Sequence, residues 1–177
     1  LSIRRQRQMC IRDRVNTEPK DMYLSRVAAI NGGCAESTPA YNVNRLCGSG
    51  LQAIVNASQS ILLGDCDIAI GGGAENMSRA PYASLASRWG IRMGDAKMVD
   101  MMIGALHDPF HNIHMGVTAE NVAAKYGITR EMQDALALES HNRAERATAA
   151  GYFKDQIMPV MLKSKKGDVA YTTDEHF

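Results

Sequence analysis

The chain has 177 residues with 45% hydrophobic and 22% charged residues, a net charge of +1 and four cysteines. This composition is ordinary for a globular protein and argues against a disordered class. The apolar stretches are far shorter than the roughly 20 residues of a membrane-spanning helix, so we expect no membrane partner. The nearly neutral charge gives no general attraction to nucleic acid, which leaves a small molecule as the expected partner.

The cysteines do not have the spacing of a zinc site, because the sequence has no C-x-x-C pair and no cysteine with a close histidine. We therefore expect no metal site. Free thiols of this kind fit a reducing compartment and predict a cytoplasmic protein.

Residues 1–14 differ in composition from the rest of the chain, since they carry five arginines and one aspartate. A basic arm for nucleic acid is one interpretation, but no aromatic or periodic pattern accompanies the arginines. The run RQRQMCIRDR resembles translated adaptor or read-through sequence. We therefore expect residues 1–14 to be a non-native or disordered extension.

From residue 15 onward the patterns predict alternating helices and strands. In chain order we expect a helix over residues 22–30, a strand over 41–46, a helix that begins at the CGSG run and ends near Gly64, and a strand over 66–70. Strand, helix and strand in this order predict a βαβ unit of a parallel sheet. The second helix is expected because its apolar residues are spaced three, four and seven positions apart, at Leu51, Ile54, Val55, Ile61 and Leu62.

The second half of the chain begins with a Pro- and Gly-rich excursion over residues 81–116. Two helices are expected after it, over residues 118–126 and 129–150, each with a threonine at the N-cap and a glycine after its end. In the second of these helices, Glu139 and Arg143 are spaced to pair across one turn.

Cys47 is the candidate nucleophile, because the predicted strand ends and the predicted helix begins around it. Unpaired N–H groups at a helix N-terminus favour a thiolate and can stabilise an oxyanion. Gly48 and Gly50 leave room for a substrate carbonyl. From local geometry alone, a small buried hydrophobic residue is an equally good interpretation of Cys47. Cys66 is expected to pack inertly in a strand, and Cys34 to lie in a turn.

Three blocks in the second and third quarters of the sequence resemble thiolases: NVNRLCGSGLQA from Asn42, GGGAENMSRAPY from Gly71 and HMGVTAEN from His114. The similarity extends over residues 15–177 and is greatest to bacterial β-ketothiolases and acetyl-CoA acetyltransferases. It implies an α/β fold, a thiolase-like layered α/β/α arrangement that is incomplete and has an inserted loop region. Residues 15–80 would form part of the catalytic core, and residues 81–177 the loop region with the following helices.

The same resemblance implies roles for individual residues. Cys47 would carry the acyl group as a thioester, while His114 and Met115 would line the path of the coenzyme A pantetheine and the acyl pocket. Without the resemblance, a histidine bonded to a carbonyl and a packing methionine are the better interpretations. Gly48 and a buried, hydrogen-bonded Glu75 would support the site.

Two neighbouring features have plainer interpretations. Gly71, Gly72 and Gly73 lack the Lys-Ser or Lys-Thr of a phosphate loop, so they are expected to permit close backbone packing. The basic residues from Arg79 to Lys97 would meet coenzyme A phosphates or a neighbouring subunit, or form a solvated face.

The resemblance thus implies an acyltransferase of fatty acid metabolism that forms or cleaves 3-oxoacyl-CoA, with coenzyme A as substrate or product, no other cofactor, and a dimeric or tetrameric parent enzyme. Motifs like GHP and CxGGG, which carry the activating histidine and second cysteine of thiolases, do not occur. We therefore expect a fragment of the N-terminal half that is inactive alone. A ketosynthase-type condensing enzyme and a non-catalytic thiolase-like lipid-binding protein are the alternatives.

Overall fold

The computed structural model describes residues 8–12 and 17–174, with side chains from residue 17 onward. The chain divides into two compact units, residues 1–115 and residues 116–177. Each unit is described by itself.

A three-stranded parallel sheet forms the centre of the first unit. Strand β1 (Gln8–Arg12) lies in the middle, with β2 (Ala40–Val43) on one side and β3 (Ala69–Gly73) on the other. Met9 is in register with Ala40 of β2 and with Ile70 of β3. Two strands that follow each other in the predicted βαβ unit, β2 and β3, are therefore parallel but separated by β1.

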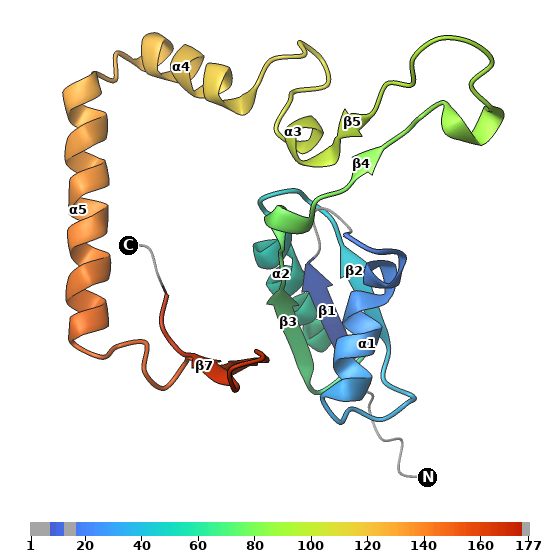
Figure 1. Cartoon of the computed structure of the whole chain (residues 1–177). Helices are drawn as coiled ribbons and strands as arrows, with labels where there is room; N and C mark the ends of the chain where they lie inside the picture. The colour runs from blue at the N-terminus through green and yellow to red at the C-terminus, as the bar shows by residue number, and fades with distance from the viewer. Residues whose placement is uncertain (1–7, 13–16, 175–177) are drawn as a thin grey trace. The chain divides into compact units, whose positions relative to one another are not determined.

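Helices cover both faces of this sheet. Helix α1 (Leu24–Asn31), which follows the 3-10 turn η1 (Pro19–Tyr23), connects β1 to β2, and α2 (Ser49–Leu62) connects β2 to β3. The connection from β1 to β2 crosses the sheet in one direction, and the connection from β2 to β3 crosses it in the other. Because crossovers of this kind are right-handed, their helices lie on opposite faces of the sheet. Figure 1 shows α1 in front of the sheet and α2 behind it. The predicted layered α/β/α arrangement is confirmed in this unit.

Small residues make up the buried faces of these helices. Helix α2 buries Ser49, Ala53, Ala57 and Ser60, which recur every three or four positions and so lie on one face. The large apolar residues whose spacing predicted the helix are not on this buried face, since Leu51 is 70% exposed and Ile54 is 54% exposed. Short side chains let the helix axis approach the sheet more closely than leucine or isoleucine would allow.

Gly71 in β3 is where the close approach is tightest. A Cβ atom built at this position would lie 3.0 Å from the backbone C and O atoms of Ala53 and 3.0 Å from the Cα atom of Ile54. At Gly72 a Cβ atom would meet no atom within 4 Å. The prediction that the glycine run permits close backbone packing is confirmed at Gly71.

Several predicted boundaries differ from the structure. Strand β2 ends at Val43 rather than residue 46, and β3 begins at Ala69 rather than residue 66. Cys66 therefore precedes its strand, although it is buried, with 2% of its surface exposed. Helix α2 ends as expected, because Gly64 follows it with a φ of 79°, in the left-handed region that closes helices.

The extension predicted for residues 1–14 overlaps with β1. Gln8–Arg12 pairs with strands on both sides, whereas residues 1–7 and 13–14 lie outside the described residues. The native or non-native origin of residues 1–14 stays a prediction.

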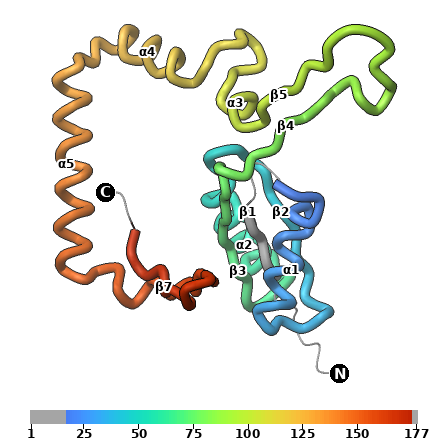
Figure 2. The backbone as a smooth tube through the Cα atoms, viewed as in Figure 1, coloured from blue at the N-terminus to red at the C-terminus, as the bar shows by residue number. Residues whose placement is uncertain are grey.

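After β3 the chain enters a segment with little regular structure, which the tube in Figure 2 follows. It contains the 3-10 turns η2 (Met77–Arg79) and η3 (Ser87–Trp89), and β4 (Tyr82–Ala83), which pairs antiparallel with β5 (Val99–Asp100). Helix α3 (Met101–Ala105) follows, and the Asp100 carboxylate caps it by accepting from the N–H groups of Met102 and Ile103. This segment matches the predicted excursion.

The second unit consists of two helices and a hairpin. Helix α4 (Met115–Tyr126) begins three residues before the predicted Thr118, and α5 (Arg130–Ala149) has the predicted N-cap, Thr129. The Glu139–Arg143 pair is confirmed at 2.8 Å. Strands β6 (Val160–Leu162) and β7 (Val169–Tyr171) pair antiparallel. Neither helix has a buried residue.

The described residues contain neither a candidate membrane-spanning helix nor a candidate metal cluster. Within residues 8–12 and 17–174, no helix has the length and apolar character needed to cross a lipid bilayer. The same ranges contain no cluster of three or more His, Cys, Asp or Glu side chains with the geometry to hold a metal ion.

Candidate active site

Cys47 lies in a tight turn between β2 and α2. The sequence predicted a strand that leads directly into the helix, whereas the structure has a five-residue connection, residues 44–48, between Val43 and Ser49. Gly48 is the N-cap of α2, so Cys47 immediately precedes the cap. The helix begins later than predicted, and the candidate nucleophile is part of the turn rather than of the helix.

Hydrogen bonds of the backbone and of two side chains close this turn. The N–H of Gly48 donates to the carbonyl of Arg45 at 3.1 Å, and the N–H of Ser49 donates to the carbonyl of Leu46 at 3.0 Å. The Asn44 side chain accepts from the N–H of Leu46 at 3.0 Å, and the Ser49 hydroxyl accepts from the N–H of Arg45 at 2.7 Å. The backbone is therefore held on both sides of Cys47.

The turn contains a strained residue directly before the cysteine. Leu46 has a φ of 47°, in the left-handed region that residues with a side chain rarely occupy. This conformation costs a leucine roughly 1–2 kcal/mol. Such strain persists only where surrounding interactions hold it, and it is found preferentially at functional sites.

The thiol of Cys47 is available to a ligand. The Cys47 side chain is exposed and is not in a disulfide. The N–H groups of Gly48 and Ser49 donate to carbonyls within the turn. The turn thus presents one nucleophilic sulfur beside the main-chain N–H of the same residue. The interpretation of Cys47 as a buried packing residue is wrong for this chain.

Glu75 is placed differently from the prediction. It is exposed rather than buried, because it lies in the loop after β3 where the chain leaves the sheet. With Ala74, Asn76 and Arg79 it forms one wall of a cavity of about 220 Å³. Thr17, Asp21 and Leu24 line the other side of this cavity, and Cys47 is not among its lining residues.

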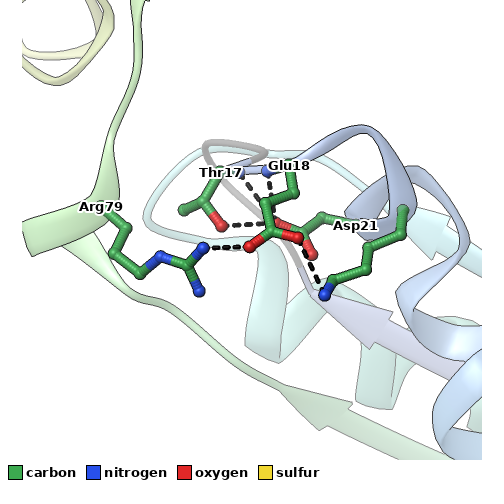
Figure 3. A network of polar contacts seen from close by, with 5 residues as sticks. Thr17, Glu18, Asp21 and Arg79 are labelled. Carbon is green, nitrogen blue, oxygen red and sulfur yellow. Dashed lines mark hydrogen bonds and ion pairs between the residues drawn. The ribbon is translucent and has the colours of Figure 1, made fainter.

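A polar network includes three of the residues that line this cavity, Thr17, Asp21 and Arg79 (Figure 3). The Glu18 carboxylate pairs with Lys20 at 2.8 Å and with Arg79, 61 positions further along the chain. The hydrogen bond from Lys20 and then that from Arg79 hold the pKa of Glu18 below its ordinary value. Arg79, a candidate for coenzyme A phosphates, is therefore engaged in an internal ion pair that ties the loop after β3 to η1.

Asp21 organises the other part of the same network. Its carboxylate accepts from the Thr17 hydroxyl at 2.5 Å and from the N–H of Glu18 at 2.8 Å. These hydrogen bonds lower the pKa of the Asp21 carboxyl, and the bond from the Thr17 hydroxyl lowers it most. The carboxylates of Glu18 and Asp21 are thus both paired with neighbouring donors.

His114 and Met115 lie at the end of a loop that follows α3. The N–H of Met115 donates to the carbonyl of Leu106 at 2.8 Å, and the His107 and His114 rings meet edge to face with their centroids 5.4 Å apart. Nδ1 of His107 lies 2.8 Å from the carbonyl oxygen of Ile103. His114 is exposed, and Met115 is 40% exposed. Both can meet a ligand, but the contacts described here join them to their own loop and not to Cys47.

The sequence reasoning missed the role of Ser49. It treated the CGSG run as small residues around a nucleophile, and it considered only the glycines. The signal was available, because serine is a favoured residue for bonding to nearby backbone groups at helix starts. Ser49 is 0% exposed, and its hydroxyl contacts both Arg45 and Leu46.

Comparison with known proteins gives a consistent result. The model of the thiolase N-terminal domain matches residues 8–177. The β-ketothiolase BktB of Cupriavidus necator is 70% identical over 162 residues, which are 92% of this chain and 41% of that protein. An acetyl-CoA acetyltransferase of the same organism is 51% identical over 85% of this chain and 39% of its own length. The chain therefore spans about 40% of the length of these relatives.

Solved structures agree. The human mitochondrial 3-ketoacyl-CoA thiolase superposes with a TM-score of 0.90 at 37% identity, covering 99% of this chain and 45% of that one. The acetyl-CoA acetyltransferase of Bacillus anthracis gives a TM-score of 0.89 at 37% identity, over 99% of this chain and 44% of that one.

Proposed function

We propose that in the parent protein Cys47 carries acyl groups taken from coenzyme A thioesters, because this chain belongs to the thiolase family. The observation that carries the proposal is the exposed thiol beside an N–H donor at a strained turn. Nucleophilic catalysis needs a reactive atom that a substrate can reach and a donor aimed at the charge that develops.

The first stage is acylation of the cysteine. The Cys47 thiolate attacks the carbonyl carbon of an acyl-CoA, and the carbonyl oxygen becomes an oxyanion to which the Cys47 N–H can donate. The carbon–sulfur bond to coenzyme A then breaks, and the departing coenzyme A thiolate takes up a proton. The products are an acyl-cysteine thioester and free coenzyme A.

The second stage transfers the acyl group to an acceptor. In synthesis the acceptor is the carbanion of acetyl-CoA, and the product is a 3-oxoacyl-CoA; in thiolysis the acceptor is coenzyme A itself. Both directions need bases for the thiol and the α-proton. The thiolase motifs that supply them do not occur in this chain, so we expect the 177-residue chain to turn over little or no acetoacetyl-CoA.

His114 and Met115 are proposed to line the pantetheine path and the acyl pocket. Their exposure in this chain supports the proposal, since a residue that meets substrate must be reachable. Glu75 and Gly48 are proposed to support the site. In this chain Glu75 would do so through the loop that Arg79 holds, rather than as a buried carboxylate.

The remaining properties of the parent protein are proposals of the same kind. We place it in the cytoplasm, in fatty acid metabolism, as a homodimer or homotetramer. Coenzyme A serves as substrate and product, with no further cofactor, nucleic acid or membrane partner.

Intact-mass spectrometry of the parent protein tests the proposal. After incubation with acetyl-CoA, the parent should gain one acetyl group, the Cys47→Ala variant should gain none, and a Cys34→Ala control should gain one. An undiminished adduct on Cys47→Ala would move the nucleophile elsewhere. An adduct formed only from acyl groups on a carrier protein would indicate a ketosynthase, and binding of acyl-CoA without an adduct would indicate a lipid-binding protein.

A further inference from the structure

Ser49 makes two side-chain hydrogen bonds within the turn around Cys47. Its hydroxyl accepts from the N–H of Arg45 at 2.7 Å and donates to the carbonyl of Leu46 at 2.6 Å. The side chain is 0% exposed, so water does not compete for these bonds. The Leu46 carbonyl oxygen also accepts from the N–H of Ser49 at 3.0 Å.

These bonds fix the direction of the Cys47 amide. The carbonyl of Leu46 and the N–H of Cys47 belong to one peptide unit, which is planar and trans, so the two groups point in opposite directions. Two donors from Ser49 hold the carbonyl toward the start of α2. The N–H of Cys47 must therefore point away from the start of the helix.

The same bonds hold Leu46 in its left-handed conformation. A leucine with a φ of 47° would relax to a commoner backbone geometry if nothing opposed it. Rotation of Leu46 would turn its carbonyl, and with it the N–H of Cys47. Ser49 opposes this rotation because it anchors the carbonyl and, through the N–H of Arg45, the residue before it.

We propose that Ser49 is a positioning residue that aims the Cys47 amide at the carbonyl oxygen of the thioester. The inference rests on the proposed function and adds to it the residue on which oxyanion stabilisation depends. Ser49 does not touch substrate. Its hydroxyl acts through the peptide unit between Leu46 and Cys47.

Two reactions of the same thiol separate positioning from folding. With S-phenyl thioacetate the Cys47 thiolate attacks the carbonyl carbon, an oxyanion forms, the bond to the phenyl-bearing sulfur breaks, and thiophenolate leaves as the anion. With iodoacetamide the thiolate displaces iodide from a CH₂ carbon, and no oxyanion forms. An aimed N–H therefore accelerates acylation but not alkylation. At alkaline pH, where thiols are ionised, the ratio of the two rates measures the contribution of the amide.

The 177-residue chain is the protein for this test, with rates assigned to each cysteine by peptide mass mapping. In the wild type the ratio of acylation to alkylation should be higher at Cys47 than at Cys34, a partly exposed thiol on the same chain. Ser49→Ala should lower the ratio at Cys47 by about 10-fold, less than the 10²–10³ lost when an oxyanion donor is removed outright, because the donor is misaligned rather than deleted.

Matched variants control for loss of structure. Ser60→Ala removes a buried hydroxyl from the same helix and should leave the ratio at Cys47 unchanged. Protection of Cys66, which is 2% exposed, reports an intact fold in each variant. If Ser49→Ala loses this protection, Ser49→Thr and Ser49→Val provide a second comparison, because they have the same shape and differ by the hydroxyl.

The outcomes distinguish the two proposals. A wild-type ratio at Cys47 no higher than that at Cys34 contradicts the proposed function itself. A high wild-type ratio that is equal in Ser49→Ala, or equal in Ser49→Thr and Ser49→Val, overturns the role of Ser49 alone. A ratio that falls only when the Ser49 hydroxyl is absent supports both.

Discussion

Replacing Gly71 with alanine tests how closely β3 approaches α2. The added Cβ atom would lie 3.0 Å from three backbone atoms of Ala53 and Ile54, whereas carbon atoms in contact prefer about 3.5–4.0 Å. Backbone atoms of a helix cannot rotate away as a flexible side chain can, so the strand and the helix must separate. Overpacking of this kind costs about 1–3 kcal/mol. We expect Gly71→Ala to lower the free energy of unfolding by about 2 kcal/mol.

Gly72→Ala is the matched control, because it makes the same chemical change in the same strand where a Cβ atom meets nothing within 4 Å. Replacing a strand glycine restricts the unfolded chain, so this variant should be neutral or more stable by up to about 1 kcal/mol.

Urea unfolding followed by circular dichroism measures the difference between the two variants. With a slope of about 2 kcal/mol per molar urea, the midpoint of Gly71→Ala should fall by about 1 M, while that of Gly72→Ala should not fall. The reasoning is refuted if the two variants have the same midpoint, or if Gly71→Ala is as stable as the wild type.

Two further predictions concern local interactions. The pKa of Glu18 is lowered in the folded chain, so its contribution to stability is present above the pKa of the unfolded chain and is lost as the pH falls through the lower folded pKa. The Glu18→Gln variant should therefore lose part of the dependence of unfolding on acid pH, which a pH series of unfolding curves would detect. High salt should weaken this effect. The hydroxyl of the N-cap Thr129 accepts from the N–H of Met132 at 3.3 Å. The Thr129→Ala variant should destabilise α5 by about 1 kcal/mol and reduce the helical circular dichroism signal. Unchanged helicity would show that the cap does not stabilise the helix.

Features encoded over a few residues could be predicted from the sequence. The Gly64 end of α2, the Thr129 cap of α5 and the Glu139–Arg143 pair all follow from side chains and backbone groups within four positions of one another. These three predictions needed no knowledge of tertiary packing. For Cys47 the local geometry left a nucleophile and a packing residue equally open, and the resemblance to thiolases favoured the nucleophile.

Features set by packing could not be predicted in the same way. The periodicity of α2 pointed to its large apolar residues, but a close approach at Gly71 requires small residues such as Ala53 on the face toward the sheet. Glu75 was expected to lie buried and hydrogen bonded behind the nucleophile, yet it is exposed, because its exposure depends on where the chain leaves β3. The composition of residues 1–14 likewise gave no sign of the backbone pairing of Gln8–Arg12.

The helices of the second unit have a calorimetric consequence. The heat-capacity change of unfolding arises mainly from apolar surface that becomes hydrated, and α4 and α5 keep every residue at least partly in contact with water. Melting of these helices therefore adds little to the heat-capacity step and spreads over a broad temperature range, as for helices held by caps and ion pairs. In a calorimeter, the sharp part of the transition would report the sheet and the two helices packed against it.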